Sequence, residues 1–351
     1  MTTGTCDTAA GTVLASGWDL GGVHLKSARL VAGANGERRL EWAIHPFEIW
    51  REPDRLAERL ARLERGGPLA VTLTAELSDL FPDRSAGVRA LLDAVASAVG
   101  DRFTLLNVEG RLVTAETARR APLAVASANF IAPAAIAARA FSTGLVLDVG
   151  STTTDIVPFD RGRPCPDGRS DRERLAAQEL VYTGALRTPP AALAASVPIG
   201  GGLVATIPEH FTQMADVHVI LGRITLEEYT VATPDGRGRD RAACLARLGR
   251  LVGADPGDLG DEEIRRMAAY LHDRQVERIA DAVGAVARRL APGRTASLPA
   301  VVCGAGRFLA AEACRRAGCV PRPIEQVLPG LGADWGRAAP AAALALLAAE
   351  A

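Results

Sequence analysis

The stretch GLVLDVGSTTTDIVPF, residues 144–159, predicts two strands joined by a tight turn. An apolar run ends at Asp148, and a second carboxylate, Asp155, opens the next apolar run. Gly150 lets the backbone reverse close to a ligand, because it has no Cβ atom. The turn also offers hydroxyl and backbone N–H groups from four successive residues: Ser151, Thr152, Thr153 and Thr154. Such a concavity binds anions, and Mg²⁺ is commonly held by one or two carboxylates together with substrate phosphates.

A related pattern occurs near the start of the chain, in GWDLGGVHLKSARLV, residues 17–31. Asp19 follows a short apolar run, and Gly21 and Gly22 form the turn before the next run. An Asp-x-Gly sequence at a strand end is also typical of an ordinary hairpin turn. By itself, this segment therefore leaves phosphate binding and a plain hairpin both open.

A third segment, AVVCGAGRFL at residues 300–309, predicts a strand, a glycine turn at Gly304 and Gly306, and then a helix. The N-terminus of a helix attracts anions. A glycine pair before a helix can also serve packing alone. The three segments in this order are more specific than any one of them, and together they predict phosphate binding.

Lys26 is the only lysine among the 40 Lys and Arg residues, and it lies just after the first glycine turn. An ammonium group is a compact point charge that suits phosphate oxygens, a task that a guanidinium performs differently. Chance placement on a solvated strand is the simpler interpretation. The neighbouring turn favours a lysine that takes part in binding or catalysis.

The composition is that of a folded protein with a substantial core. Of the 351 residues, 48% are hydrophobic and 23% are charged, and the length predicts two domains. The formal net charge of −1 argues against nucleic acid or a membrane surface as partner. The first ten residues lack a secretory pattern, and the six cysteines lack metal-binding spacing. We therefore expect a cytoplasmic protein with reduced thiols.

Further polar residues lie in apolar or glycine-rich surroundings. Arg187 lies in an apolar segment, where a bidentate contact with a phosphate or carboxylate and a structural ion pair both remain open. Asp216 follows the glycine turn at residues 200–202 and is a candidate substrate ligand. Glu76 and Asn129 could face a cleft, although a capping or surface role is the more ordinary interpretation.

Three other segments have simple interpretations. The arginine-rich residues 161–174 predict, for the most part, a solvated surface loop. The apolar residues 121–140 predict a buried helix with breaks at Pro122 and Pro133. His218 lies in an apolar segment and is interpreted as a hydrogen-bonded core residue.

The chain thus divides into two α/β halves, each opened by an Asp-x-Gly hairpin. The simplest architecture is an internal duplication, with two mixed-sheet domains around a central cleft. The predicted domains are residues 1–142 plus 338–351 and residues 143–337. We expect the C-terminal helix, residues 340–350, to pack on the first half.

The three glycine turns resemble the phosphate-one, phosphate-two and adenosine motifs of the acetate and sugar kinase, heat-shock chaperone and actin superfamily. The triple threonine followed by Asp155 is similar to the hydantoinase and oxoprolinase branch. Over essentially the full length, the chain looks closer still to the synthases of methanofuran and methylofuran biosynthesis. The segments that carry this closer resemblance are residues 17–22, Lys26, residues 182–184, residues 187–189 and residues 214–217.

This resemblance implies a transferase that serves the biosynthesis of a one-carbon carrier. An aminomethylfuran methyl diphosphate would react with the phenol of γ-glutamyltyramine, forming an aryl ether and releasing diphosphate. The residues suit this reaction. Mg²⁺ held by Asp19 and Asp148 would neutralise the leaving diphosphate, Lys26 would hold its oxygens, and Asp155 could accept the phenol proton. Phosphate or substrate contacts are expected from Gly21, Gly22, Gly150, Ser151, Thr152, Thr153, Thr154, Arg187, Asp216, Gly304 and Gly306.

Two other functions stay open. An ATP-dependent small-molecule kinase or amide-ring hydrolase of the same fold predicts ATP turnover and a nucleotide at residues 304–307. A non-catalytic partner protein switched by nucleotide predicts tight nucleotide binding with slow hydrolysis. The sequence also leaves open whether the chain forms a homo-oligomer.

Overall fold

The computed structural model describes residues 2–4, 11–64, 66–293 and 295–351. The chain forms two compact units. The first unit comprises Met1–Val146, Val157–Ala177 and Arg322–Ala351, and the second comprises Leu147–Ile156 and Gln178–Pro321. The domain boundaries given above remain a prediction.

A seven-stranded mixed sheet in the order β1-β4-β3-β2-β5-β6-β7 forms the base of the first unit. Strands β2, β3 and β4 make an antiparallel meander, and β5 then pairs with β2 in parallel. Strand β6 continues in parallel, and β7 closes the edge as its antiparallel neighbour. The strands are β1 (Thr2–Gly4), β2 (Thr12–Leu20), β3 (His24–Ala32), β4 (Arg38–Pro46), β5 (Leu69–Leu73), β6 (Thr104–Leu106) and β7 (Leu112–Thr114).

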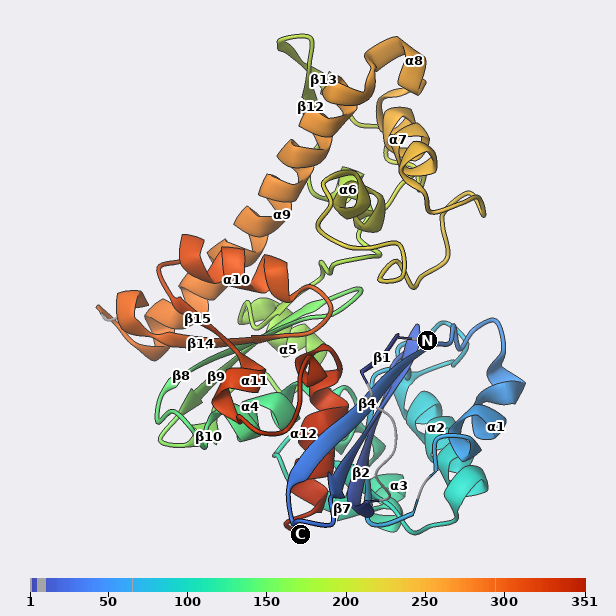
Figure 1. Ribbon diagram of the computed structural model, residues 1–351, viewed down its shortest axis with the longest axis vertical. Helices are drawn as coiled ribbons and strands as arrows, with labels where there is room; N and C mark the ends of the chain where they lie inside the picture. Colours follow the sequence, from blue (N-terminus) through green and yellow to red (C-terminus); the bar gives the residue numbers. More distant parts are fainter. Residues whose placement is uncertain (1, 5–10, 65, 294) are drawn as a thin grey trace. The chain divides into compact units, whose positions relative to one another are not determined.

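The C-terminal helix α12 (Ala339–Ala348) packs on β2, β3 and β5, which matches the expectation for the end of the chain (Figure 1). Most of its residues are buried Ala and Leu, so its backbone can approach the strands closely. The other α-helices of this unit are α1 (Leu56–Ala61), α2 (Arg84–Val99), α3 (Ala115–Arg120), α4 (Ile131–Ala137), α5 (Asp171–Ala176) and α11 (Ile324–Val327). Short 3₁₀ helices occupy Pro53–Arg55, Pro122–Ala124, Ala128–Phe130 and Trp335–Ala338.

Helix α2 shows how the sequence pattern produces this packing. The Asp83 carboxylate caps the helix by accepting a hydrogen bond of 2.8 Å from the backbone N–H of Ala86. Val88, Leu91 and Val95 recur at helical spacing and are fully buried in the core of the unit. The apolar stripe of α2 is therefore the face that packs into the core beneath the sheet.

The prediction for residues 121–140 is only partly confirmed. The segment forms two 3₁₀ turns before α4 begins at Ile131, so it is not one helix. Pro133 does not break α4, because it lies in the first turn, where a missing N–H group breaks no helical hydrogen bond.

The polar segment 161–174 is also less solvated at its end than predicted. Arg174 is buried, and its guanidinium lies 3.7 Å from the centre of the Phe130 ring. Stacking on an aromatic face satisfies part of a buried guanidinium. This residue thus belongs to the core of the first unit, whereas the earlier residues 161–163 are exposed as predicted.

The second sheet has the order β10-β9-β8-β14-β15, with β11 added to β9. Strand β8 lies between β9, its hairpin partner, and the later strand β14, just as β2 lies between β3 and β5. This repeated arrangement agrees with an internal duplication. The strands are β8 (Gly144–Val149), β9 (Thr154–Asp160), β10 (Arg163–Pro164), β11 (Leu180–Val181), β14 (Pro299–Cys303) and β15 (Val320–Pro323).

The long helix α9 (Asp261–Leu290) organises the helical part of the second unit. Figure 1 shows it running from α10 to the hairpin of β12 and β13, and α6, α7 and α8 also pack on it. The remaining elements are α6 (Met214–Ile220), α7 (Arg241–Gly249), α8 (Pro256–Leu259), α10 (Arg307–Arg316), β12 (Ser196–Ile199) and β13 (Gly202–Ala205). Three 3₁₀ helices, Pro190–Ala192, Arg250–Val252 and Thr295–Ser297, complete the unit.

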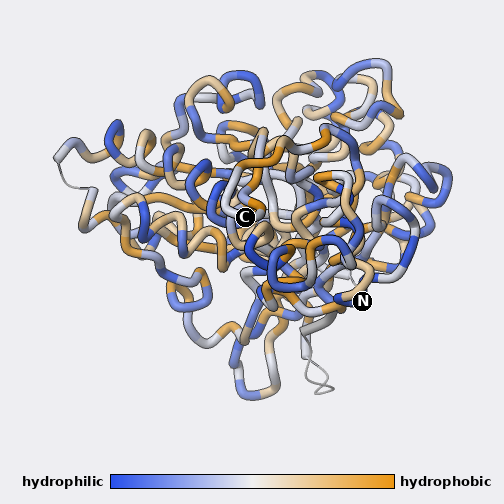
Figure 2. Tube along the Cα trace, turned by 90° about the horizontal axis from the view of Figure 1, so that it is seen from above, coloured by the Kyte–Doolittle hydropathy of each residue, from blue (hydrophilic) through white to orange (hydrophobic). Residues whose placement is uncertain are grey.

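Hydrophobic and hydrophilic stretches are interspersed along the chain (Figure 2). Within the described ranges, no helix combines the length and the apolar character that crossing a bilayer requires. No disulfide joins the five cysteines that the structure describes; Cys6 lies outside the described residues.

Candidate phosphate and metal site

The first predicted turn is a tight hairpin between β2 and β3. The Gly21 N–H donates to the carbonyl oxygen of His24 at 3.0 Å, which closes the turn. The register places Asp19 directly opposite Lys26. Lys26 Nζ lies 3.0 Å from Asp19 Oδ2, and the two side chains are 20% and 3% exposed. The turn therefore presents a largely desolvated ion pair at the end of β2.

The second oxygen of this carboxylate is available for a ligand. Asp19 Oδ1 is buried, and no hydrogen-bond donor contacts it among the residues that the structure describes. A buried carboxylate oxygen without a donor is costly unless a ligand or water completes it. This atom fits an oxygen ligand of a divalent cation.

The second predicted turn joins β8 and β9. The Gly150 N–H donates to the carbonyl oxygen of Thr153 at 2.9 Å, so the chain reverses within four residues. Ser151, Thr152 and Thr153 are half-buried and remain accessible to a ligand. Thr154 differs from the prediction, because it is fully buried and its hydroxyl donates to the Thr183 carbonyl oxygen at 2.7 Å. Its side chain therefore links the turn to residue 183 and is not exposed to a ligand.

The segment that contains Arg187 packs directly on this turn. The Ala185 N–H donates to the Gly150 carbonyl oxygen at 2.8 Å. The N–H groups of Leu186 and Arg187 both donate to the Ser151 carbonyl oxygen, at 3.0 and 2.9 Å. The structure thus brings Arg187 to the backbone of the second turn, where the sequence alone could not place it.

Gly184 makes this contact possible. A Cβ atom at this position would lie 2.5 Å from the Thr152 nitrogen. Two backbones can therefore meet only because residue 184 has no side chain.

The third predicted turn lies against Asp148. Gly304 has a φ of +85°, and a Cβ atom there would lie 2.2 Å from Asp148 Oδ1. The Gly306 N–H donates to the Val149 carbonyl oxygen at 2.8 Å and anchors the start of α10 to the end of β8. Within the second unit, the structure therefore brings the second and third glycine turns together around the Asp148 carboxylate.

Asp155 lies at the start of β9, in the same hairpin as Asp148. Its side chain is buried, and the residue is paired with Leu180 across β9 and β11. The hairpin thus carries one carboxylate on each of its two strands, as the sequence predicted.

Asp216 differs from the prediction of a substrate ligand. Its carboxylate is fully buried; Oδ1 accepts hydrogen bonds from Arg247 Nη2 at 2.7 Å and from the Tyr229 hydroxyl at 2.9 Å. Oδ2 accepts from the Thr212 hydroxyl at 3.0 Å and from the Gln213 N–H at 3.2 Å. With both oxygens engaged by protein donors, this carboxylate is a structural residue.

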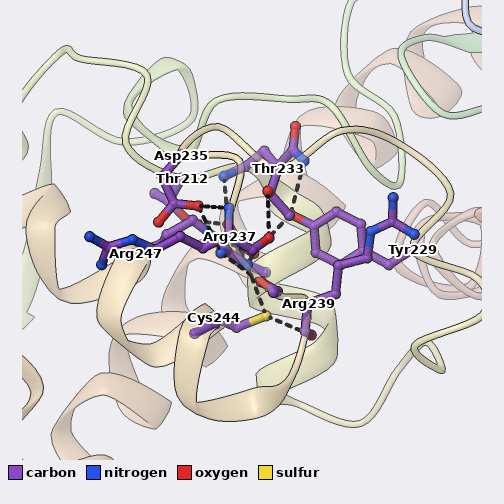
Figure 3. A network of polar contacts seen from close by, with 12 residues as sticks. Thr212, Tyr229, Thr233, Asp235, Arg237, Arg239, Cys244 and Arg247 are labelled. Carbon is purple, nitrogen blue, oxygen red and sulfur yellow. Dashed lines mark hydrogen bonds and ion pairs between the residues drawn. The ribbon is translucent and has the colours of Figure 1, made fainter.

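The same buried network extends through Arg247 (Figure 3). Arg247 Nη1 also contacts the Asp235 carboxylate at 3.1 Å and the Gly238 carbonyl oxygen at 2.9 Å. Burial, and then the charge of Asp216, raise the pKa of the Tyr229 hydroxyl, so Tyr229 stays protonated. The network joins α6 and α7 to the loop between them.

A second buried network, which sequence reasoning missed, holds the segment that packs on the second turn. Gln275 of α9 donates to the Thr183 hydroxyl at 2.9 Å and to the Gly184 carbonyl oxygen at 2.8 Å. The Gln275 carbonyl oxygen lies 3.1 Å from His218 Nε2, which confirms His218 as a hydrogen-bonded core residue. The sequence held no signal for this contact, since 92 residues separate Gln275 from Thr183.

Glu76 is the second residue whose role the sequence did not reveal. It lies just beyond β5, is 1% exposed, and accepts a hydrogen bond of 2.6 Å from the Ser127 hydroxyl. The expectation of a capping or surface role is therefore wrong. The sequence pattern that indicates such a residue is a carboxylate shortly after a largely apolar strand, here β5.

No cluster of three or more His, Cys, Asp or Glu side chains that could hold a metal occurs among the described residues. A Mg²⁺ ion at these turns would consequently need oxygens from its substrate. Such shared ligation is usual for Mg²⁺ in phosphate sites.

The two mixed sheets, built on the same arrangement of hairpin and parallel strand, form an α/β actin-like fold, which confirms the fold class read from the sequence. The family model described as hydantoinase/oxoprolinase matches residues 69–350. The chain belongs to the hydantoinase/oxoprolinase family.

Within that family, the chain is similar to two curated proteins named (4-{4-[2-(gamma-L-glutamylamino)ethyl]phenoxymethyl}furan-2-yl)methanamine synthase. The protein from Methanocaldococcus jannaschii is 34% identical over 281 residues, which cover 79% of this chain and 83% of the relative. The protein from Methanococcus vannielii is 30% identical over 145 residues, covering 41% of this chain and 65% of the relative.

Among solved structures, nucleotide-free acetone carboxylase has the same fold. It superposes with a TM-score of 0.60 at 11% identity, and the match covers 96% of this chain and 70% of that one. At this level of identity the likeness concerns the fold alone.

Proposed function

We propose that this chain is a synthase that joins an aminomethylfuran methyl diphosphate to the phenol oxygen of γ-glutamyltyramine and releases diphosphate. The observation that carries the proposal is the 34% identity, over 83% of its length, to the relative from M. jannaschii that is named for the corresponding ether product. The retained phosphate-type turns support it, because the proposed leaving group is a diphosphate.

The residues at the two turns fit a magnesium ion. Asp19 offers a buried oxygen that lacks a hydrogen-bond donor within the described part of the chain, and Asp148 lies against the glycine turn at Gly304. Carboxylate oxygens are the ligands that Mg²⁺ prefers. When bound, the ion supplies Lewis-acid stabilisation of the negative charge that develops on the leaving diphosphate. We propose Asp19 and Asp148 as its protein ligands.

Other residues of the turns would hold the diphosphate oxygens. Lys26 contributes a partly buried ammonium group that is already oriented by Asp19. Ser151, Thr152 and Thr153 add accessible hydroxyls, and Arg187 is held on the backbone of their turn. Donors fixed in advance are well suited to charge that develops during a reaction. Close backbone approach would come from Gly21, Gly22, Gly150, Gly304 and Gly306.

The proposed reaction is a nucleophilic substitution at the furan methylene carbon. The bond between the furan methylene carbon and the diphosphate oxygen breaks, and its electron pair leaves with the diphosphate. A bond forms between that carbon and the phenol oxygen, and the phenol proton passes to a carboxylate. Asp155 is the candidate acceptor read from the sequence, and an Asp155→Asn variant with full turnover would remove it from that role.

A nucleotide-dependent activity of the same fold is the second candidate. The observation that favours it is the contact between the third glycine turn and the second: Gly306 is bound to Val149, and Gly304 touches Asp148. A nucleotide could use both turns at once. This alternative predicts ATP turnover, whereas the synthase consumes none.

The test is to incubate the purified chain with Mg²⁺, the furan diphosphate and γ-glutamyltyramine, and to follow product by mass spectrometry and diphosphate by a coupled assay. The proposal expects the ether and diphosphate in equal amounts, and loss of both on chelation of the metal. A parallel reaction with ATP and each substrate alone tests the alternative. ATP hydrolysis without ether formation would overturn the proposal.

A further inference from the structure

Glu76 lies at the centre of a buried polar cluster in the first unit, and this cluster includes none of the three predicted turns. Its Oε1 accepts a hydrogen bond from the Ser127 hydroxyl at 2.6 Å and a longer one from Arg84 Nη2 at 3.4 Å. The Ser127 hydroxyl also lies 3.4 Å from the Asp171 carboxylate. The cluster thus joins the segment after β5, helix α2, the loop before α4 and the start of α5.

Among the described residues, one oxygen of this cluster lacks the hydrogen bond that a purely structural network would supply. Glu76 Oε2 is buried, and it has no hydrogen-bond partner within the described residues. Burial, the largest influence, raises the pKa of Glu76 above its ordinary value; the Ser127 hydrogen bond and the Arg84 charge oppose this, and the Asp171 charge adds to it. A buried carboxyl with one unused oxygen is costly, and groups of this kind concentrate at functional sites.

The backbone at Ser127 is strained in a way that supports a functional role. Its φ is +50°, in the left-handed region that non-glycine residues seldom occupy. In this conformation the Ser127 hydroxyl donates to Glu76 Oε1 and accepts a hydrogen bond from Arg84 Nη2. Strained residues of this kind persist where the surrounding structure gains from a fixed geometry.

The sheet register brings Glu76 to the edge that carries the first turn. Strands β2 and β5 run in parallel, with Asp19 opposite Thr72 and Leu20 opposite Leu73. The Thr74 N–H continues the ladder by donating to the Leu20 carbonyl oxygen at 2.9 Å. Glu76 therefore follows the end of β5 at the same edge where Asp19 and Lys26 end the β2–β3 hairpin.

We propose that Glu76 is the group that takes the proton of the phenol acceptor, an inference that rests on the proposed function. In this step Glu76 Oε2 accepts the phenol proton, the phenol oxygen bonds to the furan methylene carbon, and the diphosphate leaves with the electron pair of the broken bond. Ser127 and Arg84 are positioning residues, since they contact Glu76 rather than the acceptor.

Glu76 suits this role better than Asp155. Asp155 shares its hairpin with Asp148, a proposed magnesium ligand, whereas Glu76 belongs to none of the three glycine turns. The groups around Glu76 are the neutral Ser127, the positive Arg84 and the negative Asp171. Burial, the largest influence, raises the pKa of Glu76. A base is most effective when its pKa lies near the working pH.

The test compares Glu76→Gln with wild type, with Asp155→Asn, and with Glu116→Gln as a matched control, because Glu116 is an exposed glutamate of α3. Each protein is assayed with γ-glutamyltyramine and with a ring-nitrated derivative whose phenol is already ionised at pH 8. We expect Glu76→Gln to lose at least about 100-fold in kcat with the natural phenol. It should recover most of the wild-type rate with the nitrated one. Binding of Mg²⁺-diphosphate, measured by calorimetry, should be unchanged.

The outcomes separate the two proposals. Absence of ether with wild type overturns the proposed function and this inference with it. With wild type active, full turnover by Glu76→Gln overturns the inference alone, and so does an equal loss with both phenols, which would show a structural role. Rescue of Asp155→Asn by the nitrated phenol, and not of Glu76→Gln, would assign the proton to Asp155.

A second variant keeps the inference testable if Glu76→Gln does not fold. Ser127→Ala retains the carboxyl and removes a hydrogen bond that lowers the pKa of Glu76. The activity of wild type should rise with pH as Glu76 ionises, and in Ser127→Ala this rise should occur at higher pH. An acidic limb of kcat/KM that stays in place would contradict the inference.

Discussion

Lys26 and Asp19 face each other across β2 and β3, with 3.0 Å between the ammonium nitrogen and Oδ2. The pair uses one carboxylate oxygen and leaves the other, Oδ1, without a hydrogen-bond donor within the described residues. Because the sequence contains a single lysine, this ammonium group is unique among its side chains. The pair thus fixes an ammonium group beside a carboxylate whose second oxygen has no donor in the described part of the chain, and the proposed metal-bound diphosphate site rests on this arrangement.

Replacing Lys26 tests its role in binding the diphosphate. Lys26→Met should lower kcat/KM by about 10- to 100-fold, because a hydrogen bond to a charged group is worth about 1.5–3 kcal/mol. The measurement is steady-state kinetics with the furan diphosphate varied, together with calorimetry of Mg²⁺-diphosphate binding. Arg29→Gln is the control on the same strand, since Arg29 forms a partly exposed pair with Glu41. Unchanged diphosphate affinity in Lys26→Met would contradict the proposed contact.

Gly184→Ala should disturb the second turn without direct change to any proposed ligand. The added methyl group would meet the Thr152 nitrogen at 2.5 Å, so one of the two backbones must move. We expect weaker Mg²⁺-diphosphate binding by at least about tenfold, since small displacements of positioned groups have large effects. Gly202→Ala is the matched control, because the nearest atom to its Cβ would be 3.9 Å away. Equal affinity in both variants would show that the 183–188 segment does not shape the turn.

Arg247→Met should destabilise the helical part of the second unit. It leaves the buried Asp216 carboxylate without its guanidinium partner, a loss of about 3–5 kcal/mol for a buried pair. Urea denaturation followed by circular dichroism measures it. Arg250→Met removes a partly exposed contact to Asp235 and should cost less than about 1 kcal/mol. If the double variant Asp216→Leu/Arg247→Met is no more stable than Arg247→Met, the unpaired charge is not the cause.

His218 should make the protein less stable in mild acid. Burial, and then the charge of His272, lower the pKa of His218 to about 3, against an ordinary value of 6.5. Between these two values the unfolded chain binds a proton that the folded chain does not, so the free energy of unfolding falls as pH falls. From pH 7 to pH 5 this group accounts for about 2 kcal/mol.

The measurement is urea denaturation of wild type and His218→Gln at pH 7 and pH 5. The variant keeps a side-chain amide that can contact Gln275 and has no ionisable ring, so its stability should depend less on pH. His272, whose pKa burial also lowers, keeps part of the slope in both proteins. The exposed His210→Gln is the control and should behave as wild type. A slope that is the same in His218→Gln and wild type would contradict the assignment.

Local features of the site could be predicted from the sequence, because they depend on neighbouring residues. A short apolar run that ends in Asp-x-Gly predicts a strand and a turn, and the structure has such hairpins at Asp19 and Asp148. The apolar spacing of helix α2 is a local feature of the same kind. The resemblance of these turns to known motifs then pointed to the family.

Contacts between distant segments could not be predicted, because side-chain type does not reveal which segment a residue will meet. Asp216 was expected to bind substrate, but Arg247 and Tyr229 enclose it once α6 and α7 pack together. Gln275 reaches Thr183 only because α9 lies on that loop.

The sequence by itself determined that this chain has two acid-tipped glycine hairpins, one lysine beside the first of them, and the pattern of its family. Only the tertiary structure decided which carboxylates are enclosed by protein donors, as Asp216 is, and which keep an oxygen for a ligand, as Asp19 and Glu76 do. The physical reason is that the cost of burying a charge depends on every group packed around it, and those groups come from all parts of the chain.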